Sequence, residues 1–189
     1  MKHADGSFGT DRLLLRPFTK DDWAGLREIG NDMHASGGAV YDHAWPTSED
    51  GAKAMAERLA TRDTFFAACL KDGGRIVGLV AVNDINENGQ ADLGHMFHTA
   101  FRNKAYDTEA VRCVLDIAFA DPKVKTVKAD NAVDWPEQVA PLVDLGFKET
   151  GRGPASFAKD ERGKPIEFTA CTMEITREDW QARRQSGRS

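Results

Sequence analysis

The side chains best suited to binding or catalysis lie in one stretch, Ala91–Ala110, which reads ADLGHMFHTAFRNKAYDTEA. This stretch predicts a strand over Ala91–His98, then a short loop, then a helix from about Ala105. The first backbone N–H groups of a helix have no partner within it, and the positive end of the helix dipole lies at the same place. The junction therefore predicts a site for an anion such as phosphate, with Arg102 and Lys104 beside it.

Three titratable side chains lie in the predicted strand. His95 and His98 have an ordinary pKa near 6.5, so either could carry protons, although both are also common as plain polar residues. Two histidines without a third ligand do not indicate a metal site, and no metal is expected. Asp92 is either a structural carboxylate, paired or facing solvent, or a group that takes part in proton transfer.

The elements that must position this stretch follow from caps and turn residues in the first half of the chain. Thr19 is expected to cap one helix, and Thr47 or Ser48 a second. The stretch from Met33 to Pro46 predicts a loop. Strands are expected at Arg12–Phe18, Thr64–Leu70 and Arg75–Val82, the last two joined by a turn at Lys71–Gly74.

The second half contains a crossover between strands. Apolar residues from Val111 to Phe119 follow a helical period, which predicts a helix over about Ala105–Ala120. Gly146 is expected to end a helix over Pro136–Leu145. Further strands are expected at Val124–Ala129 and about Phe168–Ile175.

The element order β-α-α-β-β-β-α-β-α-β predicts an α/β (α+β) fold with a mixed, mainly antiparallel sheet flanked by helices. We expect the strands Ala91–His98 and Val124–Ala129 to run parallel at the centre of the sheet and to splay apart. The length suits a single domain over residues 1–189, with flexible ends at 1–10 and 181–189.

The Ala91–Ala110 stretch resembles the central motif of the GNAT superfamily, in particular its branch of ribosomal-protein N-terminal acetyltransferases. That branch typically reads E-x-G-Y, a few residues, then R-G-K-G-Y-A-T-E-A. This chain reads DLGH at Asp92–His95 and RNKAYDTEA at Arg102–Ala110. The opening TDRLLLRPFTKDDW, the LGF at Leu145–Phe147 and the EITREDW at Glu174–Trp180 are similar to further family segments in the same order. The resemblance implies a GNAT fold over nearly the whole chain.

The chain departs from the family's phosphate loop, Q/R-x-x-G-x-G/A. Arg102 matches the first position, whereas Ala105 replaces the glycine and Asp107 replaces the second small residue. Glycine allows close approach of the backbone and unusual dihedral angles. The Asp107 carboxylate is expected to repel a pyrophosphate, with a Coulomb energy of about 4 kcal/mol at 4 Å and an effective dielectric of 20. The same carboxylate suits the first turn of a helix.

A second departure precedes the LGF segment. The family usually has N-x-x-S there, where the asparagine and serine approach the CoA arm, and Trp135 and Gln138 occupy these positions here. Asn131 lies a few residues upstream and could substitute. Pro141 inside the predicted helix costs about 3 kcal/mol unless the helix bends or starts late.

The resemblance implies an acetyl-CoA-dependent N-acetyltransferase that acts on a primary amine, either a small molecule or a peptide N-terminus. Asp92 lies ten residues before Arg102, an offset at which some GNAT enzymes carry a general base, and His95 stands where the family has tyrosine. The alternative is a non-catalytic GNAT-like domain that binds a ligand or partner through the same cleft. The positions expected to contact acetyl-CoA are Met96, Phe97, His98, Arg102, Asn103, Lys104, Ala105, Tyr106, Asp107, Asn131 and Gln138.

The early loop borders the acceptor pocket in this family. In this chain the loop contains four polar or aromatic side chains that could contact an acceptor: His34, Tyr41, His43 and Trp45. We expect them to shape the pocket for the acceptor amine.

Composition narrows the remaining possibilities. A net charge of −5 argues against nucleic acid as the main partner, because phosphate binding favours a basic surface. No apolar run approaches the roughly 20 residues that span a bilayer, and the N-terminus lacks the apolar core of a signal peptide, so a cytoplasmic location is expected. We also expect a monomer or a homodimer. Three cysteines without CxxC spacing are expected to be buried free thiols.

Overall fold

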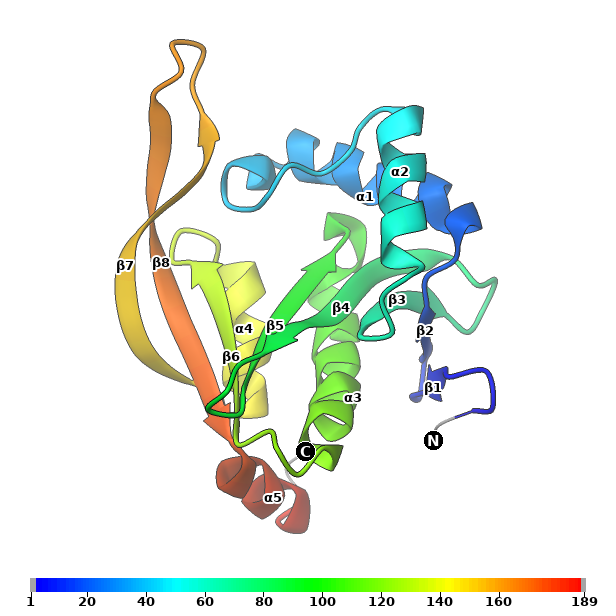
Figure 1. Ribbon diagram of the computed structural model, residues 1–189, viewed down its shortest axis with the longest axis vertical. Coiled ribbons are helices and arrows are strands. Elements are labelled where there is room, and N and C mark those ends of the chain that lie inside the picture. The colour runs from blue at the N-terminus through cyan, green and yellow to red at the C-terminus, as the bar shows by residue number, and fades with distance from the viewer. Residues whose placement is uncertain (1–2, 188–189) are drawn as a thin grey trace.

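The computed structural model describes residues 3–187, except for the side chain of Asn103. Within these residues it contains one eight-stranded sheet with the order β1-β2-β3-β4-β5-β6-β8-β7 (Figure 1). The strands are β1 (Phe8–Gly9), β2 (Leu13–Pro17), β3 (Phe65–Leu70), β4 (Ile76–Ile85), β5 (Gln90–Phe97), β6 (Thr126–Ala132), β7 (Lys148–Lys159) and β8 (Pro165–Thr176). The α-helices are α1 (Trp23–Ala35), α2 (Glu49–Leu59), α3 (Tyr106–Ala120), α4 (Pro136–Leu145) and α5 (Arg177–Gln185), and the 3-10 helices are η1 (Lys20–Asp22), η2 (Gly38–Val40) and η3 (Thr99–Lys104).

The centre of the sheet contains the expected parallel pair. Strands β5 and β6 pair in parallel from Gln90 to Asp92 on one side and from Thr126 to Lys128 on the other. Beyond these residues both strands continue without pairing to each other, β5 to Phe97 and β6 to Ala132, and Figure 1 shows them diverging. The other described pairings are antiparallel. The predicted mixed sheet with a central splay is therefore confirmed.

Local capping chemistry sets several helix ends as predicted. Thr19 and Asp22 form a capping box at the start of η1, which runs into α1. The Ser48 hydroxyl accepts a hydrogen bond from the Gly51 N–H and begins α2. Gly146 ends α4 with a φ of 93°, a conformation that disfavours residues with a Cβ atom. These ends are determined by contacts within four residues.

Other elements differ from the expectations. Helix α1 extends into the predicted Met33–Pro46 loop, η3 precedes α3, and β7 and α5 were not predicted. Most of β7 is exposed, so it lacks the apolar alternation by which a strand is read from sequence, and its structure comes from pairing with β8. The expected flexible ends contain β1 and the second half of α5.

Pro141 does not interrupt α4. The helix runs from Pro136 to Leu145 with Pro141 inside it and buried. Proline removes its own backbone donor and crowds the carbonyl four residues earlier, which here belongs to Glu137 in the first turn of the helix, and the buried ring adds apolar contact. The helix therefore continues through a residue that was expected to bend or delay it.

Helices cover both faces of the sheet and divide the core in two. One cluster of buried side chains packs the sheet against α3 and α4, and the other packs it against α1 and α2. On β5, Leu93 and Phe97 belong to the first cluster and Met96 to the second. Alternation along a strand therefore places Asp92 on the α1–α2 face and His95 on the α3–α4 face. Among residues 3–187, no helix has both the length and the apolar character to cross a membrane.

Candidate functional site

Two cavities lie on either side of the divergence between β5 and β6. The first, which we call the strand cleft, has a volume of about 300 Å³ and is lined by β5, β6, the start of α4 and the loop at Tyr41–His43. The second, which we call the helix-end cavity, has a volume of about 400 Å³ and is lined by the start of α3 and by α4. The predicted site residues divide between them: Asp92, His95, Met96, Asn131 and Gln138 line the strand cleft, and Arg102, Ala105 and Asp107 line the helix-end cavity.

Asp92 lies in the strand cleft where β5 and β6 still pair. Its carboxylate accepts a hydrogen bond from Asn83 Nδ2 at 3.0 Å and lies 3.4 Å from Lys128 Nζ. Lys128 also pairs with Asp130 at 2.8 Å. Asp92 is therefore a carboxylate held between an amide and a shared cation, in a position that reaches solvent.

His95 lines the same cleft from the other face of β5. Both ring nitrogens are buried and have no hydrogen-bond partner among the described residues. Burial, with the nearby charge of Arg102, lowers the pKa of His95 to about 4. The imidazole is therefore neutral near pH 7, and it can accept or donate a proton only through a ligand or water that enters the cleft.

The helix-end cavity is bordered by the loop that carries the altered phosphate motif. Ala105 has a φ of 56° and is the only described non-glycine residue with a positive φ. Residues with a Cβ atom disfavour this conformation, and the family places glycine here. The alanine thus keeps the backbone shape that the family's glycine supplies.

Asp107 brings a negative charge into this cavity. Its side chain is 6% exposed, and its carboxylate accepts the N–H of Thr108 at 2.8 Å, in the first turn of α3. Burial raises the pKa of Asp107, against the opposing effects of the Thr108 N–H and the Arg102 charge. The carboxylate therefore uses a helix-terminal donor that an external anion would otherwise find.

Arg102 supplies the positive charge on the other wall of the cavity. Its side chain is 9% exposed, its Nε donates to the Phe97 carbonyl at 3.0 Å, and its Nη2 has no partner among the described residues. Burial lowers its pKa, but a guanidinium remains charged. An unpaired buried guanidinium nitrogen is a group that an anion could satisfy.

Side chains separate the two cavities. The Arg102 guanidinium lies 4.7 Å from the centre of the Trp135 ring, and Gln138 Nε2 donates to Met96 Sδ at 3.3 Å. Both contacts join α4 or its cap to β5 and η3. Gly38 makes room for the indole, because a Cβ there would lie 2.5 Å from Trp135 Cη2. Trp135 and Gln138, the two departures from N-x-x-S, thus connect the start of α4 to η3 and β5 between the two cavities.

The remaining predicted residues lie outside both cavities. Phe97 is buried in the core, and Lys104 is exposed. His98 lies 3.6 Å from an Asp32 oxygen, and Tyr106 packs beneath Arg12. The side chain of Asn103 lies outside the described part of the chain. Of the early-loop residues, Tyr41 and His43 line the strand cleft, whereas His34 is exposed on α1.

Sequence reasoning missed several residues of the site. Lys128 and Asp130 lie on β6, and Phe157 of β7 reaches the cleft, where its ring lies 4.5 Å from that of His43. Arg12, near the N-terminus and 92 residues before Lys104, binds the phosphate loop. No spacing signal could have revealed these residues, because each belongs to a different element from Ala91–Ala110.

Comparison with known proteins identifies the family to which this fold belongs. A family model described as an acetyltransferase (GNAT) domain matches residues 12–148. The chain therefore belongs to the GNAT acetyltransferase family.

Individual relatives agree with this assignment. The uncharacterised N-acetyltransferase YnaD of Bacillus subtilis (strain 168) is 24% identical over 121 residues, which cover 64% of this chain and 69% of YnaD. A putative ribosomal-protein-serine acetyltransferase from Vibrio cholerae superposes with a TM-score of 0.72 at 20% identity, covering 93% of this chain and 99% of the other. Mycobacterium smegmatis RimJ, solved with CoA-disulfide, superposes with a TM-score of 0.73 at 16% identity, covering 98% and 96%. Ribosomal-protein acetyltransferases are thus among the neighbours in fold, as the sequence resemblance predicted.

GNAT enzymes use acetyl-CoA, so we asked whether the residues of the helix-end cavity suit the phosphate groups of this molecule. The αL backbone at Ala105 and the unpaired Arg102 Nη2 fit such a group. Asp107 is the local conflict, because its carboxylate lines the same cavity. Among residues 3–187, no cluster of three or more side chains could hold a metal ion.

Proposed function

We propose that this chain is an acetyl-CoA-dependent N-acetyltransferase that acetylates a primary amine, either a small molecule or a peptide N-terminus. The observation that carries the proposal is Ala105, which keeps the left-handed backbone of the family's phosphate loop although it is not glycine. Such a conformation is disfavoured for alanine and persists only where the surrounding structure holds it. Family membership supports the same reaction class.

The chain's own residues would divide the work between the two cavities. Arg102 and the loop amides would bind the phosphates in the helix-end cavity, with Asn131 and Gln138 along the arm. When bound, acetyl-CoA supplies an activated acetyl thioester. Asp92, or a water that it holds, would take the proton from the acceptor amine, because most of an amine with a pKa near 10 is protonated at pH 7. His95 is the second candidate for this proton transfer.

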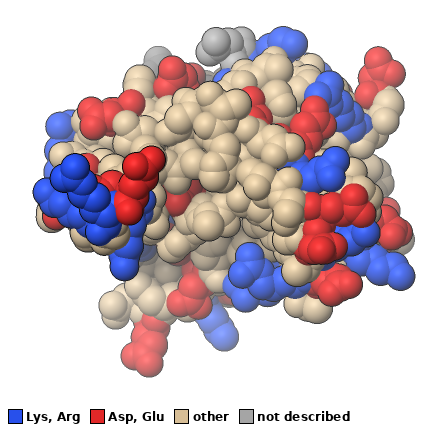
Figure 2. Space-filling view, turned by 90° about the horizontal axis from the view of Figure 1, so that it is seen from above, with Lys and Arg blue, Asp and Glu red and all other residues tan. Residues whose placement is uncertain are grey.

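The acceptor would enter through the strand cleft. The cleft contains the carboxylates of Asp42, Asp92 and Asp130 and one lysine, Lys128, so its charge favours a cationic ligand. We expect a monomer or homodimer in the cytoplasm that uses no metal, nucleic acid or membrane. Figure 2 shows both signs of charge interspersed over the face seen from above, without a continuous basic tract.

A non-catalytic GNAT-like domain remains the second candidate. Two observations favour it: the buried Asp107 carboxylate in the helix-end cavity, and the Trp135–Arg102 contact that separates the cavities. In this case the strand cleft would bind a ligand or partner without acetyl transfer.

Calorimetric titration with acetyl-CoA distinguishes the two candidates. Binding tighter than about 100 µM, which is roughly −5.5 kcal/mol, is expected for the enzyme. Absence of both binding and transfer to any amine in a panel of diamines and peptides would establish the non-catalytic alternative.

The base role is tested by Asp92→Asn in the same assays. This change keeps the size and hydrogen bonding of the side chain but removes its basic oxygen. It should lower kcat by about 10² to 10⁴ and leave the acetyl-CoA affinity nearly unchanged. Recovery at high pH, where the amine loses its proton unaided, would support the role, and full activity at neutral pH would transfer it to His95 or water.

A further inference from the structure

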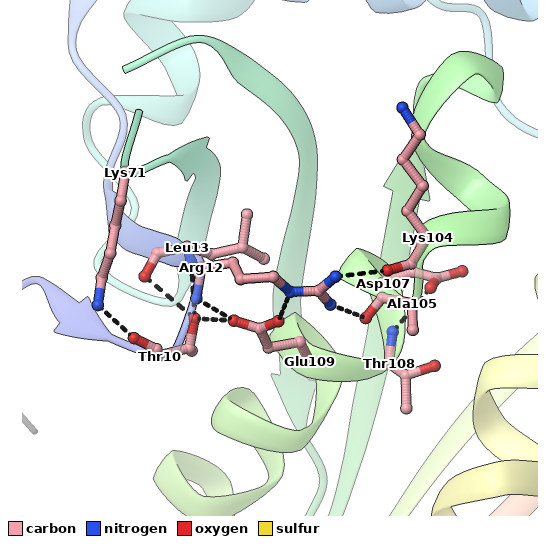
Figure 3. A network of polar contacts seen from close by, with 9 residues as sticks. All are labelled: Thr10, Arg12, Leu13, Lys71, Lys104, Ala105, Asp107, Thr108 and Glu109. Carbon is pink, nitrogen blue, oxygen red and sulfur yellow. Dashed lines mark hydrogen bonds and ion pairs between the residues drawn. The ribbon is translucent and has the colours of Figure 1, made fainter. Parts of the chain in front are cut away.

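Arg12 lies immediately before β2 and reaches the phosphate loop from behind (Figure 3). Its Nη1 donates to the Lys104 carbonyl at 2.8 Å, and its Nη2 donates to the Ala105 carbonyl at 3.2 Å. These two carbonyls flank the left-handed turn. The guanidinium also lies 4.3 Å from the centre of the Tyr106 ring. One side chain thus contacts three successive residues of the loop.

Glu109, in the first turn of α3, fixes this arginine. Glu109 Oε2 accepts from Arg12 Nε at 2.7 Å, and Oε1 accepts from the Arg12 backbone N–H at 2.7 Å. The Thr10 hydroxyl also donates to Oε1. Burial alone would raise the pKa of Glu109, but the hydrogen bonds from Thr10 and Arg12 outweigh burial and lower it. Both the side chain and the backbone of Arg12 are therefore held by one carboxylate.

We call Arg12, as held by Glu109, the arginine clamp. Peptide geometry relates this clamp to the direction of the loop N–H groups. In a trans peptide the C=O and the following N–H point in opposite directions. Because the Lys104 and Ala105 carbonyls point to Arg12, the N–H groups of Ala105 and Tyr106 point to the other side of the loop. Figure 3 shows Arg12 on the β2 side and α4 (yellow) on the opposite side, where it forms the other wall of the helix-end cavity.

The arginine clamp also helps to hold Ala105 in its left-handed conformation. A residue with a Cβ atom tends to leave the left-handed region unless neighbouring contacts hold it. Arg12 donates to both carbonyls, and the Glu109 backbone N–H also donates to the Ala105 carbonyl at 3.1 Å. A rotation that turned either carbonyl away would break the hydrogen bond from Arg12 to it. The family's glycine would need no such support.

We propose that Arg12, held by Glu109, is a positioning residue that keeps Ala105 in the left-handed conformation and thereby directs the loop N–H groups towards phosphate in the helix-end cavity. This inference rests on the proposed function, because the phosphate is that of acetyl-CoA. Arg12 itself touches neither the reacting atoms nor the cavity.

The test is a double-mutant cycle between Arg12→Lys and Ala105→Gly, with CoA titrated calorimetrically into each protein. Lysine keeps the charge but cannot present two fixed donors together with a third to Glu109. Arg12→Lys should raise the Kd for CoA about 10-fold in the wild-type background, because the loop relaxes and must be reordered on binding. In the Ala105→Gly background the left-handed turn is free, so the same change should raise Kd less than about 3-fold.

Arg184→Lys is the matched control, because Arg184 forms a surface ion pair with Asp116 away from the loop and should leave Kd unchanged. Glu109→Gln provides a second route and should shift Kd in the same direction as Arg12→Lys. Equal losses of CoA affinity in the wild-type and Ala105→Gly backgrounds would overturn the positioning role, since the loss would then not depend on holding Ala105 in the left-handed conformation.

A readout without cofactor separates this inference from the proposed function. The backbone carbon chemical shifts of Ala105 report its left-handed conformation in the free protein. They should move away from left-handed values in Arg12→Lys and stay in Arg184→Lys. Unchanged shifts in Arg12→Lys refute the inference even if CoA binds, whereas a wild type that fails to bind CoA but shows the expected shifts refutes only the proposed function.

Discussion

At the residue scale, the helix-end cavity contains two opposite charges, one that would attract a phosphate and one that would repel it. Arg102 is a buried cation with an unused donor, and Asp107 is a buried carboxylate on a helix-terminal N–H. An isolated buried charge is unfavourable, and each of these charges partly offsets the burial of the other. An incoming phosphate would compete with Asp107 for the same positive potential.

Replacing Asp107 by asparagine or alanine should therefore tighten CoA binding at pH 7, by about 3- to 10-fold if a modest part of the Coulomb repulsion is removed. Calorimetry at pH 7 and at a lower pH checks this. Since the pKa of Asp107 is raised, the wild type should approach the affinity of Asp107→Asn as the pH falls. Asp63→Ala removes an exposed carboxylate as a control for net charge. Unchanged affinity in both Asp107 variants would mean that phosphate binds elsewhere.

The same substitution has a consequence for stability. A carboxyl whose folded pKa is raised contributes stability below its unfolded pKa and loses it as the pH rises through the folded pKa. Asp107→Asn does not undergo this loss, so its free energy of unfolding at pH 7 should exceed that of the wild type, and the difference should shrink at acid pH. Denaturant unfolding at both pH values measures it.

His95 predicts a second pH dependence, of the opposite sign. Its folded pKa is lowered to about 4, whereas an unfolded histidine titrates near 6.5, so the unfolded state binds the extra proton between these values. The free energy of unfolding should fall as the pH is lowered through this window, by up to about 3 kcal/mol at about 1.4 kcal/mol per pKa unit.

The comparison of wild type with His95→Gln isolates this contribution from the other histidines. The variant should lose less stability between pH 7 and pH 4. Parallel curves for the two proteins would show that folding does not lower the pKa of His95.

At the element scale, α4 decides whether the two cavities communicate. Its cap residue Trp135 packs against Arg102, and Gln138 contacts Met96, so the start of this helix is held against β5 and η3. A helix end without these contacts would leave the splay between β5 and β6 open. The same start of α4 carries asparagine and serine in the family pattern.

Trp135→Asn combined with Gln138→Ser should therefore open the passage and lower the Kd for CoA about 10-fold, although the loss of a buried indole should cost about 3 kcal/mol of stability. Calorimetry and denaturant unfolding measure these opposite effects. Trp23→Asn is the control: this indole of α1 also lies near two cations, Arg27 and Lys53, and belongs to neither cavity. Weaker CoA binding in the double variant would show that the indole forms part of the cofactor site.

At the scale of the whole molecule, one sheet joins the two clusters of the core. Strands such as β3, β4 and β5 contribute buried side chains to both faces, so neither cluster can be exposed without breaking the other's support. We expect one calorimetric transition with an enthalpy of about 130 kcal/mol, at roughly 0.7 kcal/mol per residue, and a van't Hoff enthalpy close to it. Two resolved transitions would contradict a single cooperative domain.

Helix ends and buried helix faces could be predicted from the sequence alone, because they depend on contacts between residues close together in the chain. Ser48 and Gly146 mark helix ends by hydrogen bonds and dihedral preferences within four residues, and the Val111–Phe119 period places the buried face of α3. The family motif around Arg102 then indicated the fold, and the crossover between β5 and β6 predicted their parallel pairing.

The assembly of the site, by contrast, depends on the three-dimensional arrangement. Arg12 meets Lys104 across 92 residues of chain, Gln138 meets Met96 across 42, and β7 exists because it pairs with β8. The left-handed turn at Ala105 and the raised pKa of Asp107 depend on these surroundings rather than on the residues themselves. Contacts between distant segments, and the burial they create, leave no period or spacing in the sequence, because many chain paths could bring the same residues together or keep them apart.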